Sequence, residues 1–191
     1  KKKYVIKKKY FFLPNHFWKH KNHIVVLKAL NHLKNKIDFE IIACGNTTDY
    51  RSPEHFNYLN GYIKEKKLKK SFKILGVLPF NEVLSLMKHS ICVLNPSLSE
   101  GWSNTVDQAN CYGKKILLSD LGVHKEQKPY RGIYFKRNNY KDLSSKLMKI
   151  SSQRIDRNQE KESMLRAYND SIKKRKQYAE AYHKFIRRIL D

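Results

Sequence analysis

Residues 91–113, with the sequence ICVLNPSLSEGWSNTVDQANCYG, constrain the fold more than any other part of the chain. The apolar run at residues 91–94 predicts a short strand buried on both faces. The Pro-Ser-Leu-Ser-Glu-Gly segment that follows is typical of a loop. Ser103, Asn104 and Thr105 favour the start of a helix. We therefore expect a strand, a glycine-containing loop and a helix N-terminus in direct succession.

This unit suits an anion. Free backbone N–H groups and the positive end of the helix dipole lie where such a helix begins, and together they favour a group such as a diphosphate. Glu100 lies at the edge of this predicted anion site. Its carboxylate cannot bind phosphate, but it can accept hydrogen bonds from the hydroxyls of a sugar attached to the phosphate. Taken alone, the segment is equally compatible with a solvated glutamate in a surface loop.

The rest of the chain repeats the order of strand and helix. Strands are predicted at 10–13, 39–44, 72–75, 91–94, 115–118 and 133–135, and helices at about 22–34, 53–68, 79–87, from 103, and at 139–150. This alternation predicts an α/β fold, a Rossmann-like parallel sheet with helices on both faces. Ligands of such sheets bind beyond the carboxyl ends of the strands. The loops at 15–21, 45–48, 76–80 and 96–105 are therefore the ones expected to form a site.

Residues 157–191 are highly charged, with apolar side chains mostly three or four positions apart. These are Tyr168, Ile172, Tyr178, Tyr182, Phe185, Ile186 and Ile189. The spacing predicts a long amphipathic helix, and the basic run at 173–176 is a candidate break. Packing on the flank of the sheet is the simplest role for it. Binding to a membrane surface and packing on a partner lobe are the alternatives.

The composition is strongly basic. The 191 residues include 40 Lys and Arg against 17 Asp and Glu, which gives a net charge of +23. A field of this sign attracts sugar nucleotides, acidic lipid surfaces and nucleic acids alike. Because the basic residues are spread along the whole chain, a general preference for lysine explains the total equally well.

Cysteine usage and hydropathy predict the compartment. Cys44, Cys92 and Cys111 are far apart and each lies in or beside an apolar segment, so we expect reduced core residues and no disulfide framework. No apolar run approaches the roughly 20 residues that cross a bilayer, and the basic first ten residues contain no signal-peptide core. We therefore expect a cytoplasmic protein, soluble or peripheral on the cytoplasmic face of the membrane.

Four motifs together resemble the carboxyl-terminal, donor-binding lobe of a GT-B fold glycosyltransferase of family 4, the retaining group also called group 1. The motifs are FLPNHFWKHKNH (12–23), ILGVLP (74–79), PSLSEGWS (96–103) and GKKILLSD (113–120). They occur in the family's order and at its intervals, and the resemblance covers roughly residues 10–150.

The resemblance implies roles for two catalytic residues. Lys21 aligns with the lysine that neutralises the donor diphosphate as the leaving group gains charge, and Glu100 aligns with the glutamate that holds the hydroxyls of the donor sugar. The family usually has an arginine at the position of His16. A neutral histidine brings no charge, so Lys19 or His20 is expected to share this load.

Further substrate-binding residues follow from the same alignment. The segment after Glu100 would face the sugar and phosphates, and Gly76, Val77 and Leu78 would pack against the base. The residues of that segment are Gly101, Trp102, Ser103, Asn104 and Thr105. The family's second glutamate falls on Gln108, which can accept a hydrogen bond from the ribose without charge assistance. The neighbouring Asp107 lies about 100° around the helix.

No metal or other cofactor is expected, because members of this group use the lysine and arginine in place of a divalent cation. The donor would be a nucleotide-diphosphate sugar. A zinc site at His16, His20 and His23 is not expected, since no carboxylate accompanies them.

As a whole, the chain is expected to be the donor-binding domain of a hexosyltransferase that acts with retention in polysaccharide biosynthesis, such as that of lipopolysaccharide or capsule. Residues 1–9 would be an interlobe linker, 10–176 the nucleotide-sugar-binding domain, and 177–191 a helix that packs on a missing amino-terminal lobe. That lobe would bring the glycan or lipid-linked acceptor, so the isolated domain should be inactive. An anionic membrane is a candidate partner, and nucleic acid is not expected.

Two alternatives stay open. A nucleotide-sugar epimerase shares the GT-B architecture. A non-enzymatic basic module would bind nucleic acid or anionic membrane, with an affinity that falls steeply with salt.

Overall fold

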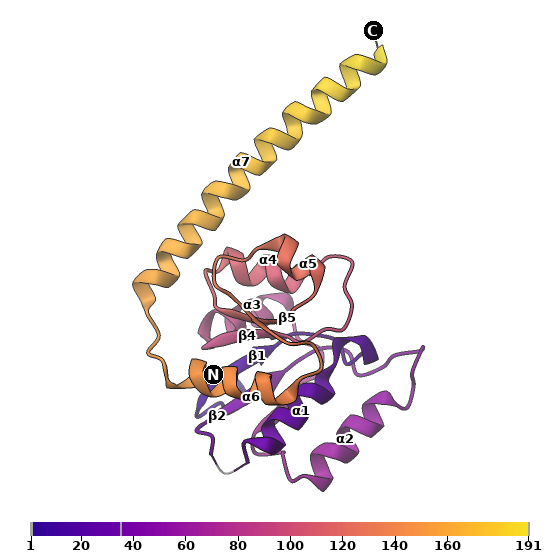
Figure 1. Ribbon diagram of the computed structural model, residues 1–191, viewed down its shortest axis with the longest axis vertical. Helices are drawn as coiled ribbons and strands as arrows, with labels where there is room; N and C mark the ends of the chain where they lie inside the picture. Colours follow the sequence, from indigo (N-terminus) through magenta and orange to yellow (C-terminus); the bar gives the residue numbers. More distant parts are fainter. Residues whose placement is uncertain (1, 35, 191) are drawn as a thin grey trace.

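A computed structural model describes residues 2–34 and 36–190. Its centre is a sheet of six parallel strands in the order β3-β2-β1-β4-β5-β6 (Figure 1). The strands are β1 (Lys9–Leu13), β2 (Phe39–Ala43), β3 (Phe72–Ile74), β4 (Cys92–Asn95), β5 (Ile116–Ser119) and β6 (Gly132–Phe135). The predicted Rossmann-like parallel sheet is confirmed.

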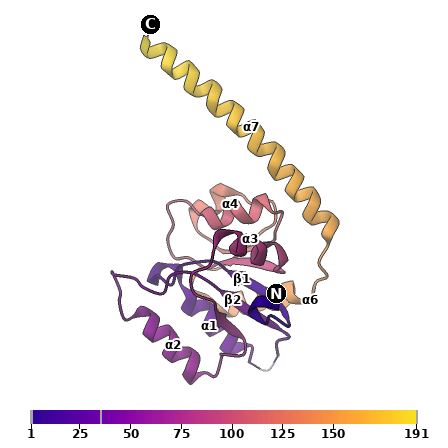
Figure 2. The same cartoon turned by 180° about the vertical axis from the view of Figure 1, so that it is seen from behind.

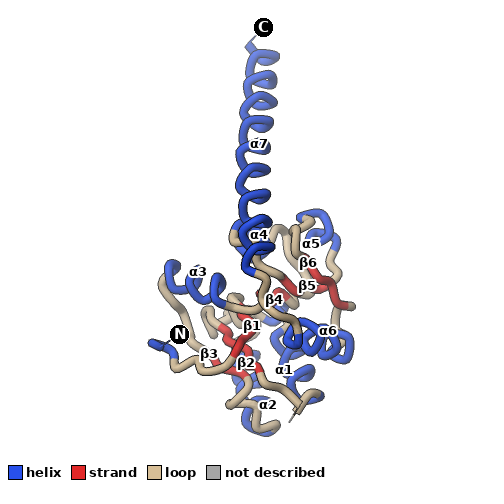
Figure 3. The backbone as a smooth tube through the Cα atoms, turned by 90° about the vertical axis from the view of Figure 1, so that its left-hand side faces the viewer, coloured by secondary structure: helices blue, strands red, loops and turns tan. Residues whose placement is uncertain are grey.

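Helices cover both faces of the sheet (Figure 3). They are α1 (His23–His32), α2 (His55–Glu65), α3 (Phe80–His89), α4 (Asn104–Cys111), α5 (Gly122–Gln127), α6 (Tyr140–Ser152) and α7 (Arg157–Leu190). Phe11 and Leu13 face the core formed with α1, α2 and α6, whereas Tyr10 and Phe12 face the core formed with α3 and α4. Because both faces are covered, the central strands are mostly apolar and do not alternate with polar residues; Glu40 in β2 and Asn95 in β4 are buried polar exceptions.

The order in which the chain adds strands to the sheet reverses between β1 and β4. From β1 the order runs through β2 to β3 on one side and through β4 and β5 to β6 on the other, so the loops leaving β1 and β4 diverge. A crevice at the carboxyl ends of the strands forms at such a switch point, and ligands of open α/β sheets bind there. The loops that follow Leu13 and Asn95 are therefore the ones expected to form the ligand site.

The structure adds to or corrects the expected local structure at three places. Within residues 1–9, which were expected to be an interlobe linker, Lys2–Tyr4 forms a short 3-10 helix; residue 1 lies outside the described residues. The α5 helix has no counterpart in the predicted elements, since its six residues are too few to show a helical period. Cys44 and Cys92 are buried, and burial raises the pKa of each thiol to about 12, but Cys111 is exposed.

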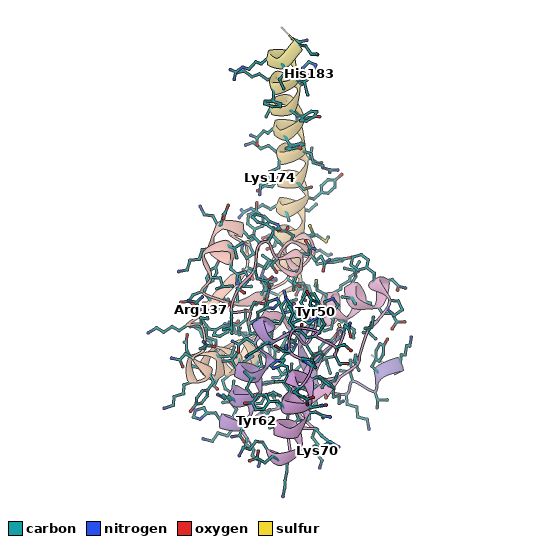
Figure 4. All side chains as sticks on the ribbon, turned by 90° about the vertical axis from the view of Figure 1, so that its right-hand side faces the viewer. Tyr50, Tyr62, Lys70, Arg137, Lys174 and His183 are labelled. Carbon is teal, nitrogen blue, oxygen red and sulfur yellow. The ribbon has the colours of Figure 1, made fainter. Side chains whose placement is uncertain are left out.

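The predicted carboxyl-terminal helix is present, but it is continuous and does not lie on the sheet. α7 runs unbroken through residues 173–176 and projects away from the domain in every view (Figures 1 and 2). Its first turns pack on α4, where Ala167 is buried. Beyond them Tyr178, Tyr182 and Phe185 are more than half exposed. In Figure 4 the side chains around His183 project with no other described element beside them. Packing on the flank of the sheet is therefore limited to the start of the helix.

The base of α7 is fixed by a buried ion pair. Lys114 Nζ lies 2.7 Å from Glu160 Oε1, with side-chain exposures of 1% and 13%, and it also donates to the carbonyl oxygen of Lys88. Burial lowers the pKa of Lys114, and the bond to Glu160 opposes that shift.

Along the part of the chain that is described, each helix is too short or too polar to cross a membrane.

Candidate functional site

A cavity of about 330 Å³ lies at the switch point of the sheet. The loop after β1 forms one wall of the cavity, and the loop after β4 forms a second wall together with the start of α4. The loop before α3 forms the third wall. Ten residues predicted to bind substrate line it: His16, Lys21, Val77, Leu78, Glu100, Trp102, Ser103, Asn104, Thr105 and Gln108. Lys19, Gly76 and Gly101 were also predicted but do not line this cavity. Pro14, Asn15, Trp18, Cys44, Gly45, Phe80 and Val83, which were not predicted, complete its walls.

The two predicted catalytic residues are in direct contact. Lys21 Nζ lies 2.8 Å from both carboxylate oxygens of Glu100, and the side chains are only 14% and 7% exposed. The Ser97 hydroxyl lies 2.7 Å from Glu100 Oε1 and 2.8 Å from Asn95 Oδ1, so its single proton is shared between the carboxylate and the amide oxygen. The two loops are also joined through the backbone, where the Leu98 N–H donates to the carbonyl oxygen of His20 at 2.7 Å. Residues 79 positions apart in sequence thus form one charged pair.

A buried network of amides and hydroxyls supports this pair. Asn15 Nδ2 donates to Asn95 Oδ1 at 3.2 Å, and Asn95 Nδ2 donates to the Ser103 hydroxyl at 2.7 Å. Since Ser103 Oγ is an acceptor in that bond, its own proton remains available to a ligand in the cavity. Thr105 completes the network by donating to Asn15 Oδ1 at 3.3 Å. The ends of β1 and β4 and the start of α4 are therefore held together by polar groups.

His124, on the unpredicted helix α5, contacts the buried polar network through Asn95. Its Nδ1 lies 2.9 Å from the Ser119 carbonyl oxygen, and its Nε2 lies 3.4 Å from Asn95 Nδ2. These partners fit a neutral ring that donates from Nδ1 and accepts at Nε2. Burial lowers the pKa of His124, which favours that neutral form. No pattern in the sequence distinguishes this histidine from the others.

His16, at the position where the family usually has arginine, is neutral in this geometry. Its Nδ1 accepts a hydrogen bond from the Asn46 backbone N–H at 2.9 Å, so the ring proton is on Nε2. The ring also contacts Trp18, with centroids 4.8 Å apart. His16 can therefore donate one hydrogen bond into the cavity, but it adds no charge.

Lys19 and His20 do not supply the missing charge either. The Lys19 side chain lines a separate pocket of about 530 Å³ beside α2, together with His55 and Asn138. Burial lowers the pKa of His20, and the neighbouring Lys21 and Arg51 cations lower it further. Among the described residues that line the cavity, Lys21 is therefore the one lysine or arginine.

The start of α4 faces the cavity through Ser103, Asn104 and Thr105. Asp107 is directed away, because it accepts hydrogen bonds from Trp102 Nε1 at 2.7 Å and from Gln127 Nε2 at 3.1 Å. Gln108, one position later, lines the cavity. Helix N-terminal amides, two amide side chains (Asn104 and Gln108) and two hydroxyls (Ser103 and Thr105) therefore lie at a single surface.

The opposite wall is apolar. Val77, Leu78, Phe80 and Val83 line it, and Val77 and Phe80 are exposed. Gly45, which also lines the cavity, has φ +144°, and a Cβ there would lie 2.6 Å from the Asn15 carbonyl oxygen, so only glycine allows the loops after β1 and β2 to approach each other. A flat ligand such as a nucleobase can pack against this wall.

Metal-binding groups do not converge on this cavity. Over residues 2–34 and 36–190, no three His, Cys, Asp or Glu side chains are placed to hold an ion. The His16, His20 and His23 triplet likewise forms no cluster: His23 is fully buried and stacks on Phe17, with ring centroids 4.3 Å apart. Burial lowers the pKa of His23 to about 3.

A parallel sheet with a cavity at its switch point, and with a helix start and a largely buried lysine lining that cavity, defines the chain as a Rossmann-like α/β domain. The chain belongs to the family described as glycosyl transferases group 1, whose sequence profile matches residues 1–171. The family resemblance carried by the four motifs is thereby confirmed.

Solved structures agree on the fold. A glycosyltransferase from Rickettsia africae shares 21% identity with a TM-score of 0.75, over 90% of this chain and 45% of that one. Anabaena HepE, in complex with UDP and glucose, shares 15% identity with a TM-score of 0.75, over 93% and 48% of the chains. The catalytic domain of the Helicobacter pylori cholesterol-alpha-glucosyltransferase shares 17% identity with a TM-score of 0.60, over 84% and 99%.

This chain thus spans about half the length of the first two structures. The likeness confirms that it has the fold of one GT-B lobe. Comparison with curated proteins gives no match.

Proposed function

We propose that this chain is the donor-binding domain of a retaining glycosyltransferase, which transfers a hexose from a nucleotide-diphosphate sugar to a glycan or lipid-linked acceptor. The observation that carries the proposal is the contact between Lys21 and Glu100 at the start of α4, within one cavity at the switch point. A cation and helix amides suit the diphosphate, and a carboxylate beside them suits sugar hydroxyls.

In this proposal the donor lies along the cavity. The diphosphate binds the amides at residues 102–104 and the ammonium of Lys21, the sugar hydroxyls donate to Glu100, and the base packs on Val77 and Leu78. Gln108 accepts from the ribose. Breaking the glycosidic bond adds negative charge to the leaving diphosphate, and fixed donors at that position lower the barrier. Lys21 and the helix start would provide this stabilisation with no metal ion.

The acceptor would come from a facing lobe. The exposed apolar side chains of α7, Tyr178, Tyr182, Phe185 and Ile189, are an extended surface that such a lobe could cover. We therefore retain residues 10–176 as the donor domain and 177–191 as the part of α7 that packs on that lobe. Two lobes are needed to enclose both substrates, so the domain alone would transfer nothing. A basic chain acting on lipid-linked acceptors would attach peripherally to the cytoplasmic face of the membrane.

The related structures support the choice of donor. Anabaena HepE has been solved with UDP and with UDP-glucose, and it shares the fold of this chain. UDP-glucose is therefore the first probe to test.

The test is a calorimetric titration of the wild-type chain with UDP, GDP and ADP sugars. We expect one of them to bind, and Lys21→Ala and Glu100→Ala to weaken that binding about tenfold or more, because each removes a charge-assisted interaction. Lys28→Ala, an exposed lysine on α1, is the matched control and should bind as the wild type does. Equal heats from the wild type and both site variants would refute the assignment.

Retention is tested separately on the protein joined to its acceptor lobe. An NMR spectrum of the glycoside formed should show the same anomeric configuration as the donor. An inverted product would contradict the retaining mechanism, and conversion of the donor to its epimer without transfer would favour the epimerase.

A further inference from the structure

We propose that the Lys21–Glu100 ion pair couples recognition of the sugar to recognition of the diphosphate, so that the site prefers an intact nucleotide sugar to the free nucleoside diphosphate. This inference rests on the proposed function. It concerns the difference in affinity between two ligands of one site, which is a separate question from whether the site binds nucleotides.

The described residues that line the cavity include one cationic and one anionic side chain. Lys21 is the single lysine or arginine among its described lining residues, Glu100 is the single acid, and His16 is neutral. An ammonium has three N–H donors, and two of them are engaged by the carboxylate at 2.8 Å. A phosphate that enters the cavity therefore meets a cation whose charge is already neutralised.

Of the two partners in the ion pair, Glu100 is the more tightly fixed. Glu100 is held by Ser97, and the carbonyl oxygen of Ser97 accepts a 2.6 Å hydrogen bond from the Ser119 hydroxyl at the end of β5. Ser97 and Ser119 are both fully buried. Lys21 has a flexible four-carbon stem and is fixed at its ammonium by Glu100 alone among the hydrogen bonds of the described residues. Ligand binding should therefore shift the ammonium and leave the carboxylate in place.

The nucleotide sugar and the free nucleoside diphosphate differ in what they present to Glu100. In a nucleotide sugar the terminal phosphate is an ester, and the sugar presents neutral hydroxyls that donate to the Glu100 carboxylate. These bonds replace those of Lys21 and release the ammonium to the diphosphate. In the free nucleoside diphosphate the terminal phosphate carries additional negative charge and has no hydroxyl to offer. It therefore faces an unneutralised carboxylate as soon as Lys21 turns toward it.

The consequence is that sugar and diphosphate bind cooperatively, as two halves of one ligand. The same arrangement favours departure of the nucleoside diphosphate once the sugar has been transferred. Glu100 would thus act on the diphosphate indirectly, through the position and charge of Lys21.

The test is a titration of the wild-type chain and Glu100→Gln with UDP, GDP and ADP, each against its sugar derivative (UDP-glucose, GDP-mannose and ADP-glucose). For the nucleotide that binds, Glu100→Gln should tighten the free diphosphate about threefold or more and weaken the sugar derivative about tenfold. The readout is the dissociation constant of the free diphosphate divided by that of its sugar derivative, and Glu100→Gln should lower this ratio. Ser97→Ala, which removes one hydrogen-bond donor from the carboxylate, should lower the same ratio by a smaller factor.

The control is Glu162→Gln, which makes the same change of charge at an exposed position on α7 and should leave the ratio unchanged. If Glu100→Gln weakens both ligands equally, or leaves the free diphosphate unaffected, the coupling is refuted while the site itself stands. If the wild-type chain binds none of the six ligands, the proposed function itself fails.

Discussion

Two histidines, His23 and His124, are fully buried in this domain, and burial lowers the pKa of both. For His23 the pKa falls from 6.5 to about 3. Between these two values the unfolded chain binds a proton that the folded chain excludes. The contribution of His23 to stability is therefore complete above pH 6.5 and is lost as the pH falls toward 3, at roughly 1 kcal/mol per pH unit.

We expect His23→Phe to have a shallower dependence of the free energy of unfolding on pH in this window, since phenylalanine can keep the stacking on Phe17 and binds no proton. Urea unfolding at several pH values measures this slope. His183→Phe, an exposed position on α7, is the control and should retain the wild-type slope. Parallel slopes for the wild type and His23→Phe would show that His23 is not buried as described.

At the residue scale, the sequence is sufficient to identify the ends of the strands but not what supports them. Lys21 and Glu100 follow two predicted strands, and parallel strands bring their carboxyl ends to one edge, so their proximity can be expected. Asn95, Ser97 and His124 cannot be identified in this way. Their roles depend on side-chain directions that are fixed by packing of α4 and α5, and an isolated polar residue in an apolar strand gives no such information.

At the scale of elements, Gly113 lies where the end of α4 packs against the first turns of α7. Gly113 ends α4 with φ +59°. The Gly113 N–H donates to the Asn110 carbonyl oxygen and the Lys114 N–H donates to the Ala109 carbonyl oxygen, which is the Schellman arrangement. A Cβ at this position would collide with the Glu160 carbonyl oxygen and lie 2.9 Å from the Met164 nitrogen. The glycine is therefore needed both for the turn and for the close approach of α7.

We expect Gly113→Ala to lower the free energy of unfolding by about 1–3 kcal/mol and to speed hydrogen exchange in the first turns of α7. Gly61→Ala is the matched control. It lies within α2 with open space around it, so the same change there should be neutral or stabilise the domain by up to about 1 kcal/mol. Equal stability of the two variants would contradict the described contact.

The elements that escaped prediction have identifiable causes. α5 is too short for a period, and its sequence, Gly-Val-His-Lys-Glu-Gln, has a single large apolar residue. A break in α7 was expected at the basic run 173–176, but lysine and arginine are good helix formers, and exposed side chains on all sides let their charges remain solvated. Charge runs therefore mark exposure more reliably than they mark helix ends.

At the scale of the molecule, α7 is the feature that the domain itself does not explain. Because residues beyond 176 lie clear of the sheet, ending the chain there should change the free energy of unfolding by less than about 0.5 kcal/mol. Chemical denaturation of the full and shortened chains measures this difference. A loss of several kcal/mol would mean that the end of α7 packs on the domain in solution.

The central claim is that Lys21, Glu100 and the start of α4 form one nucleotide-sugar site. A nitrogen–proton NMR titration with UDP-glucose tests it directly, because each backbone amide reports its own environment. We predict that the largest shifts occur at Lys21, Glu100 and residues 102–105, with α2 and the end of α7 unchanged. Shifts concentrated on α7 or on the amino-terminal edge of the sheet, with residues 102–105 unaffected, would contradict it.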